Sequence, residues 1–191
     1  MMTKDDYIID FFNNNVPDPT EGLGLRKELR KEFISWFIEE STFYAPSQVC
    51  WNEEDYRAQV SSLNGLCYIN SLRLTINYAL PLLEGFVIQS FPNCDILSYV
   101  FHSFNLSGKK VIDYTYFKNK LQFEKRGQQL PFAYIGIKIP SGFIRKARVE
   151  IFERRYGSIN SNECYSFPLM VPYYYYRRGF DWSSYQYREL H

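Results

Sequence analysis

The chain has 191 residues, 46% of them hydrophobic, which suits one domain with a sizeable core. Its net charge of +1 gives no strong field, so charge alone indicates no nucleic-acid partner. No apolar run approaches a membrane span and the start MMTKDDYIIDFF lacks a signal-peptide pattern, so we expect a soluble, cytoplasmic protein with no membrane partner.

The first third of the chain is predicted to be mainly helical. Residues 5–15 have the apolar spacing of a short helix, ended by the prolines and glycine that follow. The strongest helix pattern is 25–41, in which large apolar side chains share one face: Leu25, Leu29, Phe33, Trp36 and Phe37. Residues 45–52 are predicted to be a loop and residues 53–63 another helix.

A helix is predicted over 65–80, with Ser62 or Asn64 as its N-cap and Pro81 at its end. Strand patterns follow at 82–89, 97–106 and 109–116, and residues 132–139 suit a strand or a short turn. Helical turns are expected at 116–126, a helix at 143–156 and an irregular Tyr-rich tail at 164–188.

Helices followed by an antiparallel sheet indicate the α+β class. We expect a single domain over 1–191, made of a helical part (1–63), a catalytic core (64–140) and a helix with a Tyr-rich tail (141–191). The four cysteines are widely spaced and form no C-x-x-C, which argues against a zinc ribbon and favours thiols in a reducing cytoplasm.

The run NGLCYINSL at 64–72 places Cys67 at the head of a predicted helix. Free cysteine titrates near pH 8.5 and attacks only as the thiolate, so a nucleophilic cysteine needs an environment that favours the anion. The unpaired N–H groups of a helix N-terminus favour an anion, and Gly65 would allow the close backbone approach that an oxyanion site uses. Cys67 is therefore a candidate nucleophile, although a lone cysteine in an apolar helix is more often core.

The histidines are His102 and the terminal His191, so His102 is the candidate partner of the thiol. Two strand patterns flank Ser107-Gly108, which suits a two-residue hairpin turn. In that register His102 lies directly opposite Asp113 on one face of the sheet, where the aspartate would orient the imidazole. A turn longer by one residue would separate the two side chains.

Five short motifs resemble those of a widespread, mostly uncharacterised family of phage and bacterial proteins. The family pattern is C-x-x-N-[AS], E-G-[YF], H-A-W, G-x-V-x-D-P-T and Y-F-G-[VI], and the resemblance covers about residues 60–140. The matching runs are C-x-x-N-S at 67–71, E-G-F at 84–86, V-F-H-S-F around His102, G-K-K-V-I-D-Y-T at 108–115 and F-A-Y-I-G-I at 132–137. The chain departs from the pattern at Phe104, in place of Trp, and at Tyr114, in place of Pro.

That family resembles papain-like and transglutaminase-like thiol enzymes, so the resemblance implies a papain-like core. Carried over residue by residue, it gives the triad roles to Cys67, His102 and Asp113. The implied activity is a cysteine hydrolase or acyltransferase without a cofactor or metal, acting on a peptide, a protein or a small amide. Peptidase, deamidase and transferase activities share this machinery. The setting would be the bacterial cytoplasm, or the host cytoplasm for a phage protein.

Three polar residues are candidates for substrate contact or support. Asn70 follows Cys67 by one helical turn, where it could line the site or bond a strand end. A carboxylate in an apolar strand needs a partner, so Glu84 is expected to pair with Arg73 or to face the cleft. Asn64, like Gln59, is a weak candidate for an oxyanion-hole donor.

The main alternative is a non-catalytic phage or bacterial protein that binds a host protein through its Tyr-rich surface. The run YYYYRRGF at 173–180 could also stack on bases or hold a phosphate. A strand or extended tail packed on the core explains the same run more simply. Nucleic-acid binding is the least favoured function, because the charge is near zero.

Overall fold

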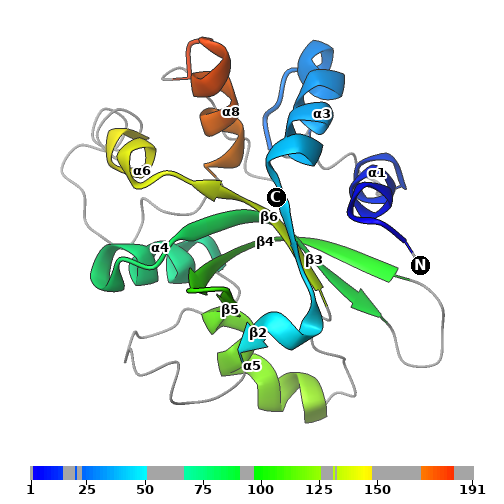
Figure 1. Ribbon diagram of the computed structural model, residues 1–191, viewed down its shortest axis with the longest axis vertical. Helices are drawn as coiled ribbons and strands as arrows, with labels where there is room; N and C mark the ends of the chain where they lie inside the picture. Colours follow the sequence, from blue (N-terminus) through cyan, green and yellow to red (C-terminus); the bar gives the residue numbers. More distant parts are fainter. Residues whose placement is uncertain are drawn as a thin grey trace.

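The computed structural model describes residues 2–14, 20, 23–50, 67–90, 97–125, 131, 133–147 and 169–182. These residues form six strands in one sheet, in the order β1-β6-β3-β4-β5-β2, with helices packed around it (Figure 1). The α+β class is therefore confirmed. The predicted helix at 53–63 lies outside the described residues, as do Ser62 and Asn64, the N-cap candidates of the helix predicted at 65–80.

The strands agree with the sequence patterns in the centre of the sheet and differ at its edges. They are β1 (Thr42–Tyr44), β2 (Val49–Cys50), β3 (Leu82–Ser90), β4 (Leu97–Ser107), β5 (Lys110–Ile112) and β6 (Ala133–Ile139). β2 runs parallel to β5 and the other neighbours are antiparallel, so the sheet is mixed and not purely antiparallel as expected. β1 was not predicted and β2 falls in the predicted loop, because strands this short leave no alternating pattern.

The two edge strands β1 and β2 are almost consecutive in the chain. Tyr44 and Val49 are joined by four residues, which reach at most about 18 Å. Strands lie about 4.8 Å apart, so the edges of a flat sheet of six strands would be about 24 Å apart. The sheet therefore has to curl, and the cyan segment between α3 and β2 in Figure 1 crosses from one edge to the other.

The helices confirm most of the sequence patterns. They are α1 (Lys4–Asn14), α3 (Arg30–Glu40), α4 (Cys67–Tyr78), α5 (Tyr114–Lys125), α6 (Ser141–Ala147) and α8 (Met170–Arg178), with 3-10 turns η1 (Lys27–Leu29) and η2 (Pro46–Gln48). The predicted helix at 143–156 is seen as α6 up to Ala147, and the rest of that range lies outside the described residues. The tail expected to be irregular at 164–188 contains α8, so that prediction is wrong for 170–178.

Helix α8 has clear start and stop signals. Pro172 is its third residue, a position where the missing N–H costs no intrahelical bond. Gly179 has a φ of +73° and donates to the Tyr176 carbonyl at 3.2 Å, while Phe180 N–H donates to the Tyr175 carbonyl at 2.9 Å. These two bonds form a Schellman motif, with the Phe180 ring against Tyr175 as its apolar contact.

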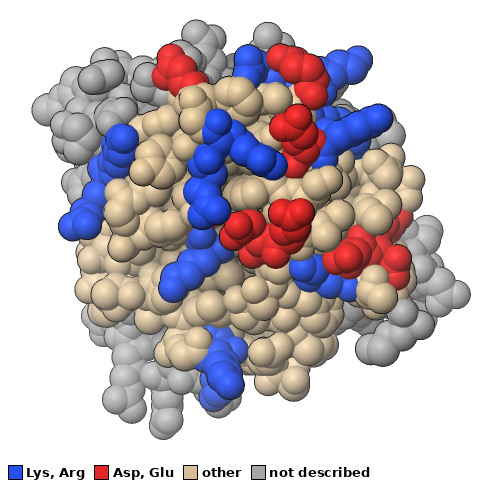
Figure 2. Space-filling view, turned by 45° about the horizontal axis from the view of Figure 1, so that its top comes forward, with Lys and Arg blue, Asp and Glu red and all other residues tan. Residues whose placement is uncertain are grey.

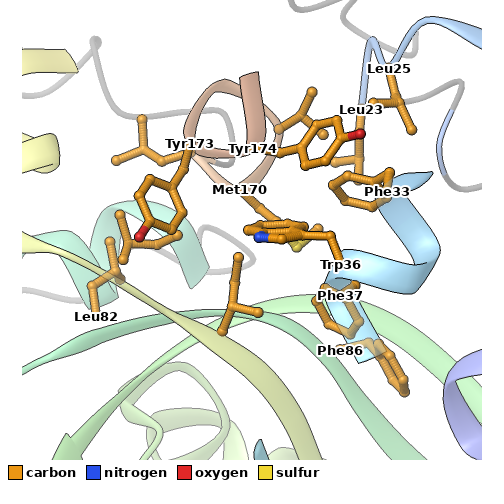
Figure 3. Close-up of a cluster of buried hydrophobic side chains, with 14 of the residues drawn as sticks. Leu23, Leu25, Phe33, Trp36, Phe37, Leu82, Phe86, Met170, Tyr173 and Tyr174 are labelled. Atoms are coloured by element: carbon orange, nitrogen blue, oxygen red, sulfur yellow. The ribbon is translucent and has the colours of Figure 1, made fainter. Parts of the chain in front are cut away.

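The sheet has a helix-covered face and an inner face. On the first, Phe86 of β3 stacks on Phe11 of α1 at 4.2 Å and on Phe37 of α3 at 6.0 Å between ring centroids. Figure 3 shows how α3 and α8 meet above this face, with Trp36 next to Tyr174 at 5.1 Å between centroids. The inner face carries a second cluster, formed by Tyr44, Leu83, Val87, Phe104, Val111, Tyr116 and Tyr134.

The Tyr-rich run is mostly core. Tyr173, Tyr174 and Tyr175 are buried and only Tyr176 is exposed, with 43% of its surface accessible. The simpler interpretation, that this run packs on the core, is therefore confirmed, although it does so as a helix. On the face shown in Figure 2 acidic and basic side chains lie side by side. Arg177 and Glu40 form an exposed ion pair at 3.4 Å.

Candidate active site

Cys67 is the first residue of helix α4 and is 8% exposed. Its backbone N–H therefore belongs to the first turn, where amide groups have no intrahelical acceptor. The other described cysteine, Cys50, is also a buried thiol. Of these two cysteines, Cys67 is the one whose charge and hydrogen bond act on His102.

The motif C-x-x-N-S places three side chains on one face of α4. Asn70 donates its side-chain amide to the Thr115 hydroxyl at 3.0 Å, and Ser71 donates its hydroxyl to the Ser103 carbonyl at 2.7 Å. Thr115 belongs to the first turn of α5, and Ser103 follows His102 on β4. The residues one helical turn after Cys67 therefore join its helix to the neighbours of both partner groups.

His102 lies on β4 and is 3% exposed. Its Nε2 lies 2.7 Å from Asp113 Oδ2, and the Cys67 side chain is a second hydrogen-bond partner of the ring. Burial by itself lowers the pKa of His102, but the charges of Asp113 and Cys67 and their hydrogen bonds raise it, to about 10. Asp113 and Cys67 therefore both favour the protonated form of the imidazole.

Asp113 is 1% exposed and occupies the N-cap position of α5. Its Oδ1 accepts the backbone N–H of Tyr116 at 3.0 Å, the bond that a capping carboxylate makes to the third helical residue. Its Oδ2 accepts both the Tyr134 hydroxyl at 2.8 Å and the imidazole of His102. A single carboxylate thus starts a helix and fixes the histidine.

The pairing of His102 with Asp113 was expected from a register that turns out to be wrong by two residues. The turn is Gly108-Lys109, with Gly108 at φ +60°, and Asn105, not Ser103, faces Ile112. A shift of two residues keeps every side chain on its face of the sheet, whereas a shift of one would not. Asp113 then lies just beyond β5, diagonal to His102, and a carboxylate reaches it there.

Two tyrosine rings enclose the imidazole. The Tyr116 ring meets the His102 ring edge to face at 5.0 Å between centroids, and the Tyr134 ring lies at 6.3 Å. Burial, then the negative charges of Asp113 and Cys67, raise the pKa of Tyr116, so its phenol stays protonated. The histidine–aspartate pair therefore lies among aromatic side chains, where charge–charge attraction is stronger than in water.

Glu84 lies on the opposite face of the sheet from His102. It is 2% exposed and accepts the backbone N–H of Met170 at 2.6 Å, at the start of α8. Burial raises the pKa of Glu84 to about 8, against the backbone hydrogen bonds from Leu169 and Met170. The partner of Glu84 is thus the backbone at the start of α8. The sequence analysis had expected a pair with Arg73 or a position facing the cleft.

Gly85, the second residue of the E-G motif, is required by the sheet itself. It faces His102 on β4 and Gly136 on β6. A Cβ at Gly85 would lie 2.7 Å from the Gly136 Cα and would collide with the Ile135 carbonyl oxygen. The motif therefore combines a helix anchor with a close approach of two strands.

The structure brings together Cys67, His102 and Asp113, with Asn70 beside them, and places Glu84 elsewhere. Asn64 and Gln59 lie outside the described residues. Sequence reasoning missed the contributions of Tyr134 and Thr115, although both lie in the runs F-A-Y-I-G-I and D-Y-T. Among the described residues no three His, Cys, Asp or Glu side chains are grouped so as to hold a metal ion.

No protein-family model, no curated protein and no solved structure matches this chain. The family resemblance therefore stays a prediction. Within the described ranges no helix is long and apolar enough to cross a bilayer.

Proposed function

We propose that the protein is a cysteine hydrolase or acyltransferase with a papain-like arrangement, in which Cys67, His102 and Asp113 form the catalytic triad. The observation that carries the proposal is the position of His102. Its Nε2 is bonded to the buried Asp113 carboxylate at 2.7 Å, and its other side is in hydrogen-bond contact with a thiol at a helix start. Nucleophile, imidazole and orienting acid in this order are the parts of thiol catalysis.

The Cys67 sulfur attacks the carbonyl carbon of an amide or ester as the thiolate, after its proton has passed to His102. The N–H groups of the first turn of α4 stabilise the oxyanion that forms. His102 then gives a proton to the leaving amine or alcohol as the C–N or C–O bond breaks, which leaves a thioester on Cys67.

The thioester is resolved by a second nucleophile. Water or an amine attacks its carbonyl carbon, loses a proton to His102, and displaces the Cys67 sulfur. Water gives hydrolysis or deamidation, and an amine gives acyl transfer. Asp113 keeps the imidazole oriented through both steps, because its carboxylate is itself held by Tyr116 and Tyr134.

The alkylation of cysteines by iodoacetamide tests the proposal, with each site followed by mass spectrometry from pH 5 to pH 9. We expect Cys67 to react well below pH 8 and to slow by at least tenfold in a His102→Gln variant. Cys50 is the internal control, since it is a thiol of similar burial (3% against 8% exposed). Equal rates at Cys50 and Cys67 at every pH would contradict the proposal.

Turnover requires a second measurement. The release of p-nitrophenol from p-nitrophenyl acetate should show a burst of one equivalent as Cys67 is acylated. Cys67→Ala should abolish the burst and leave the thermal melting curve close to that of the wild type. Unchanged ester cleavage in that variant would end the proposal.

The alternative of a non-catalytic host-binding protein has little surface to use within the described part of the Tyr-rich run, where Tyr176 is the exposed tyrosine. It becomes the better interpretation if Cys67 is inert toward iodoacetamide in the native protein.

A further inference from the structure

We propose that Tyr134 is a positioning residue of this site, whose hydroxyl holds the Asp113 carboxylate in the orientation that presents Oδ2 to His102. The inference rests on the proposed function, because it gives Tyr134 a role in the action of the triad. It adds a fourth side chain, from strand β6, to a site otherwise built from α4, β4 and the start of α5.

The geometry around Asp113 carries the inference. A carboxylate rotates broadly about its last torsion, so one hydrogen bond does not fix which oxygen faces a partner. Here Oδ1 accepts from Tyr116 N–H at 3.0 Å, and Oδ2 accepts from the Tyr134 hydroxyl at 2.8 Å and from His102 at 2.7 Å. The carboxylate is thus held at both oxygens, and His102 meets an acceptor whose direction is already set.

Tyr134 is itself held by the sheet and not by a loop. Its backbone lies in β6 between Tyr44 of β1 and Val87 of β3, and its side chain is fully buried. Its ring packs against Phe104 at 5.1 Å between centroids. The donor is therefore preorganised, which is what an orienting group beside a catalytic pair requires.

A purely structural role would be different: the hydroxyl would only supply a hydrogen bond to a buried carboxylate. Both roles predict a loss of stability in Tyr134→Phe, because a buried charged group then loses a donor. Only the positioning role predicts that the contact between Asp113 and His102 loosens. The experiment must therefore observe that contact directly.

The probe is the imidazole Nε2 proton of His102, seen by NMR on ¹⁵N-histidine-labelled protein. Bonded to a fixed, buried carboxylate, it should give a sharp downfield signal in the wild type and none in Asp113→Asn. In Tyr134→Phe we expect the signal to broaden or vanish, and the alkylation of Cys67 at pH 6 to slow roughly tenfold.

Tyr44→Phe is the matched control. Tyr44 is Tyr134's partner in the β1–β6 pairing and belongs to the same aromatic cluster, but its hydroxyl bonds the Thr42 side chain. We expect this variant to keep both the sharp signal and the wild-type alkylation rate. A sharp, unshifted signal in a folded Tyr134→Phe protein would overturn the proposal.

The two proposals fail separately. If Cys67 is inert in the wild type but the signal depends on Tyr134, the positioning role stands and the catalytic function fails. If Cys67 is reactive and Tyr134→Phe changes neither signal nor rate, the function stands and the positioning role fails.

Should Tyr134→Phe not fold, the wild type still decides: the Tyr134 hydroxyl proton must exchange slowly and show a nuclear Overhauser effect to the His102 Nε2 proton. Its absence would overturn the proposal.

Discussion

The side-chain amide of Asn70 lies 3.0 Å from the hydroxyl of Thr115, and this bond joins the helix of the candidate nucleophile to the turn of the candidate acid. Asn70 is fully buried and lies one turn after Cys67. Thr115 lies two residues after Asp113, in the turn that Asp113 caps. The Asn70–Thr115 hydrogen bond thus helps to set the distance between the Cys67 thiol and the Asp113 carboxylate, although neither group takes part in it.

Replacing Thr115 by valine, which has the same shape, removes this bond. We expect a loss of about 1–2 kcal/mol in the free energy of unfolding, since a buried amide loses an acceptor. We also expect slower alkylation of Cys67. Thr75→Val is the matched control. The Thr75 hydroxyl also accepts a hydrogen bond from a side-chain amide, that of Asn105, at 3.0 Å, but this bond does not involve the turn that follows Asp113. Urea unfolding and alkylation rates decide, and equal rates in the two variants would refute the link.

Asp113→Asn should lower the pKa of His102. In the wild type burial lowers the pKa of His102, but the charges and hydrogen bonds of Asp113 and Cys67 outweigh this effect and raise the pKa from 6.5 to about 10. Without the Asp113 carboxylate we expect the pKa to fall, because burial still lowers it and Cys67 is the remaining neighbour that raises it. An NMR titration of the His102 ring measures this, and an unchanged pKa in the variant would contradict the assigned cause.

The raised pKa of His102 also has a consequence for stability. The ionised histidine stabilises the fold fully below pH 6.5, and this contribution is lost as the pH rises through about 10. Asp113→Asn should weaken that decline, because the largest of the charges that raise the pKa is then absent. Chemical denaturation of the variant at pH 6 and pH 10 provides the comparison with the wild type.

Glu84→Gln should flatten the dependence of stability on pH. Burial raises the pKa of Glu84 from 4.5 to about 8, so the protonated form is favoured in the fold. Its contribution is fully present below pH 4.5 and is lost as the pH rises through 8. Glutamine keeps an acceptor for Met170 but does not ionise, so we expect it to gain on the wild type by a few kcal/mol, in order of magnitude, between pH 5 and pH 9.

Glu40→Gln is the control for this series. Its carboxylate forms an exposed ion pair with Arg177, and such pairs contribute about 0–1 kcal/mol. Denaturation curves at each pH should therefore run parallel for Glu40→Gln and the wild type. If Glu84→Gln also runs parallel to the wild type, then Glu84 is ionised in the fold without cost.

Gly85→Ala and Gly142→Ala should have opposite effects. A methyl group at Gly85 has no room, since it would lie 2.7 Å from the Gly136 Cα, so we expect several kcal/mol of destabilisation or a failure to fold. Gly142 lies in α6 with nothing near its Cβ position, so alanine there should stabilise by up to about 1 kcal/mol. Thermal melting of both variants checks this, and a stable Gly85→Ala protein would mean that β3 and β6 can move apart.

The sequence predicted elements with a strong repeating pattern. The apolar face of 25–41 and the alternation in 82–89 appear as α3 and β3, because burial of one face imposes those periods. The pattern at 109–116 was misleading because Asp113 caps a helix, which ends β5 at Ile112 although the alternation continues. The signals of α8 were present in Pro172 and Gly179, but four consecutive tyrosines hid the helical period.

The candidate site was only partly predictable. The sequence predicted that His102 and Asp113 lie on the same face of the sheet. That prediction holds despite a register error of two residues, because side chains on one face of a strand are two positions apart. The bonds of Glu84 to Met170 and of Tyr134 to Asp113 join residues 86 and 21 positions apart. No local pattern encodes such pairs, since they depend on where a helix docks and on the order of the strands in the sheet.

The strap from Thr42 to Cys50 contains both edge strands of the sheet, so the order in which it pairs matters for folding. Its strand pairings join Thr42 to Gly136 on one side and Cys50 to Ile112 on the other. Both pairings close long loops of the chain, and such contacts are costly to form early. We expect closure of the strap to be a late event. A chain caught before closure would present unpaired β5 and β6 edges to other molecules, and this is the species most prone to aggregate.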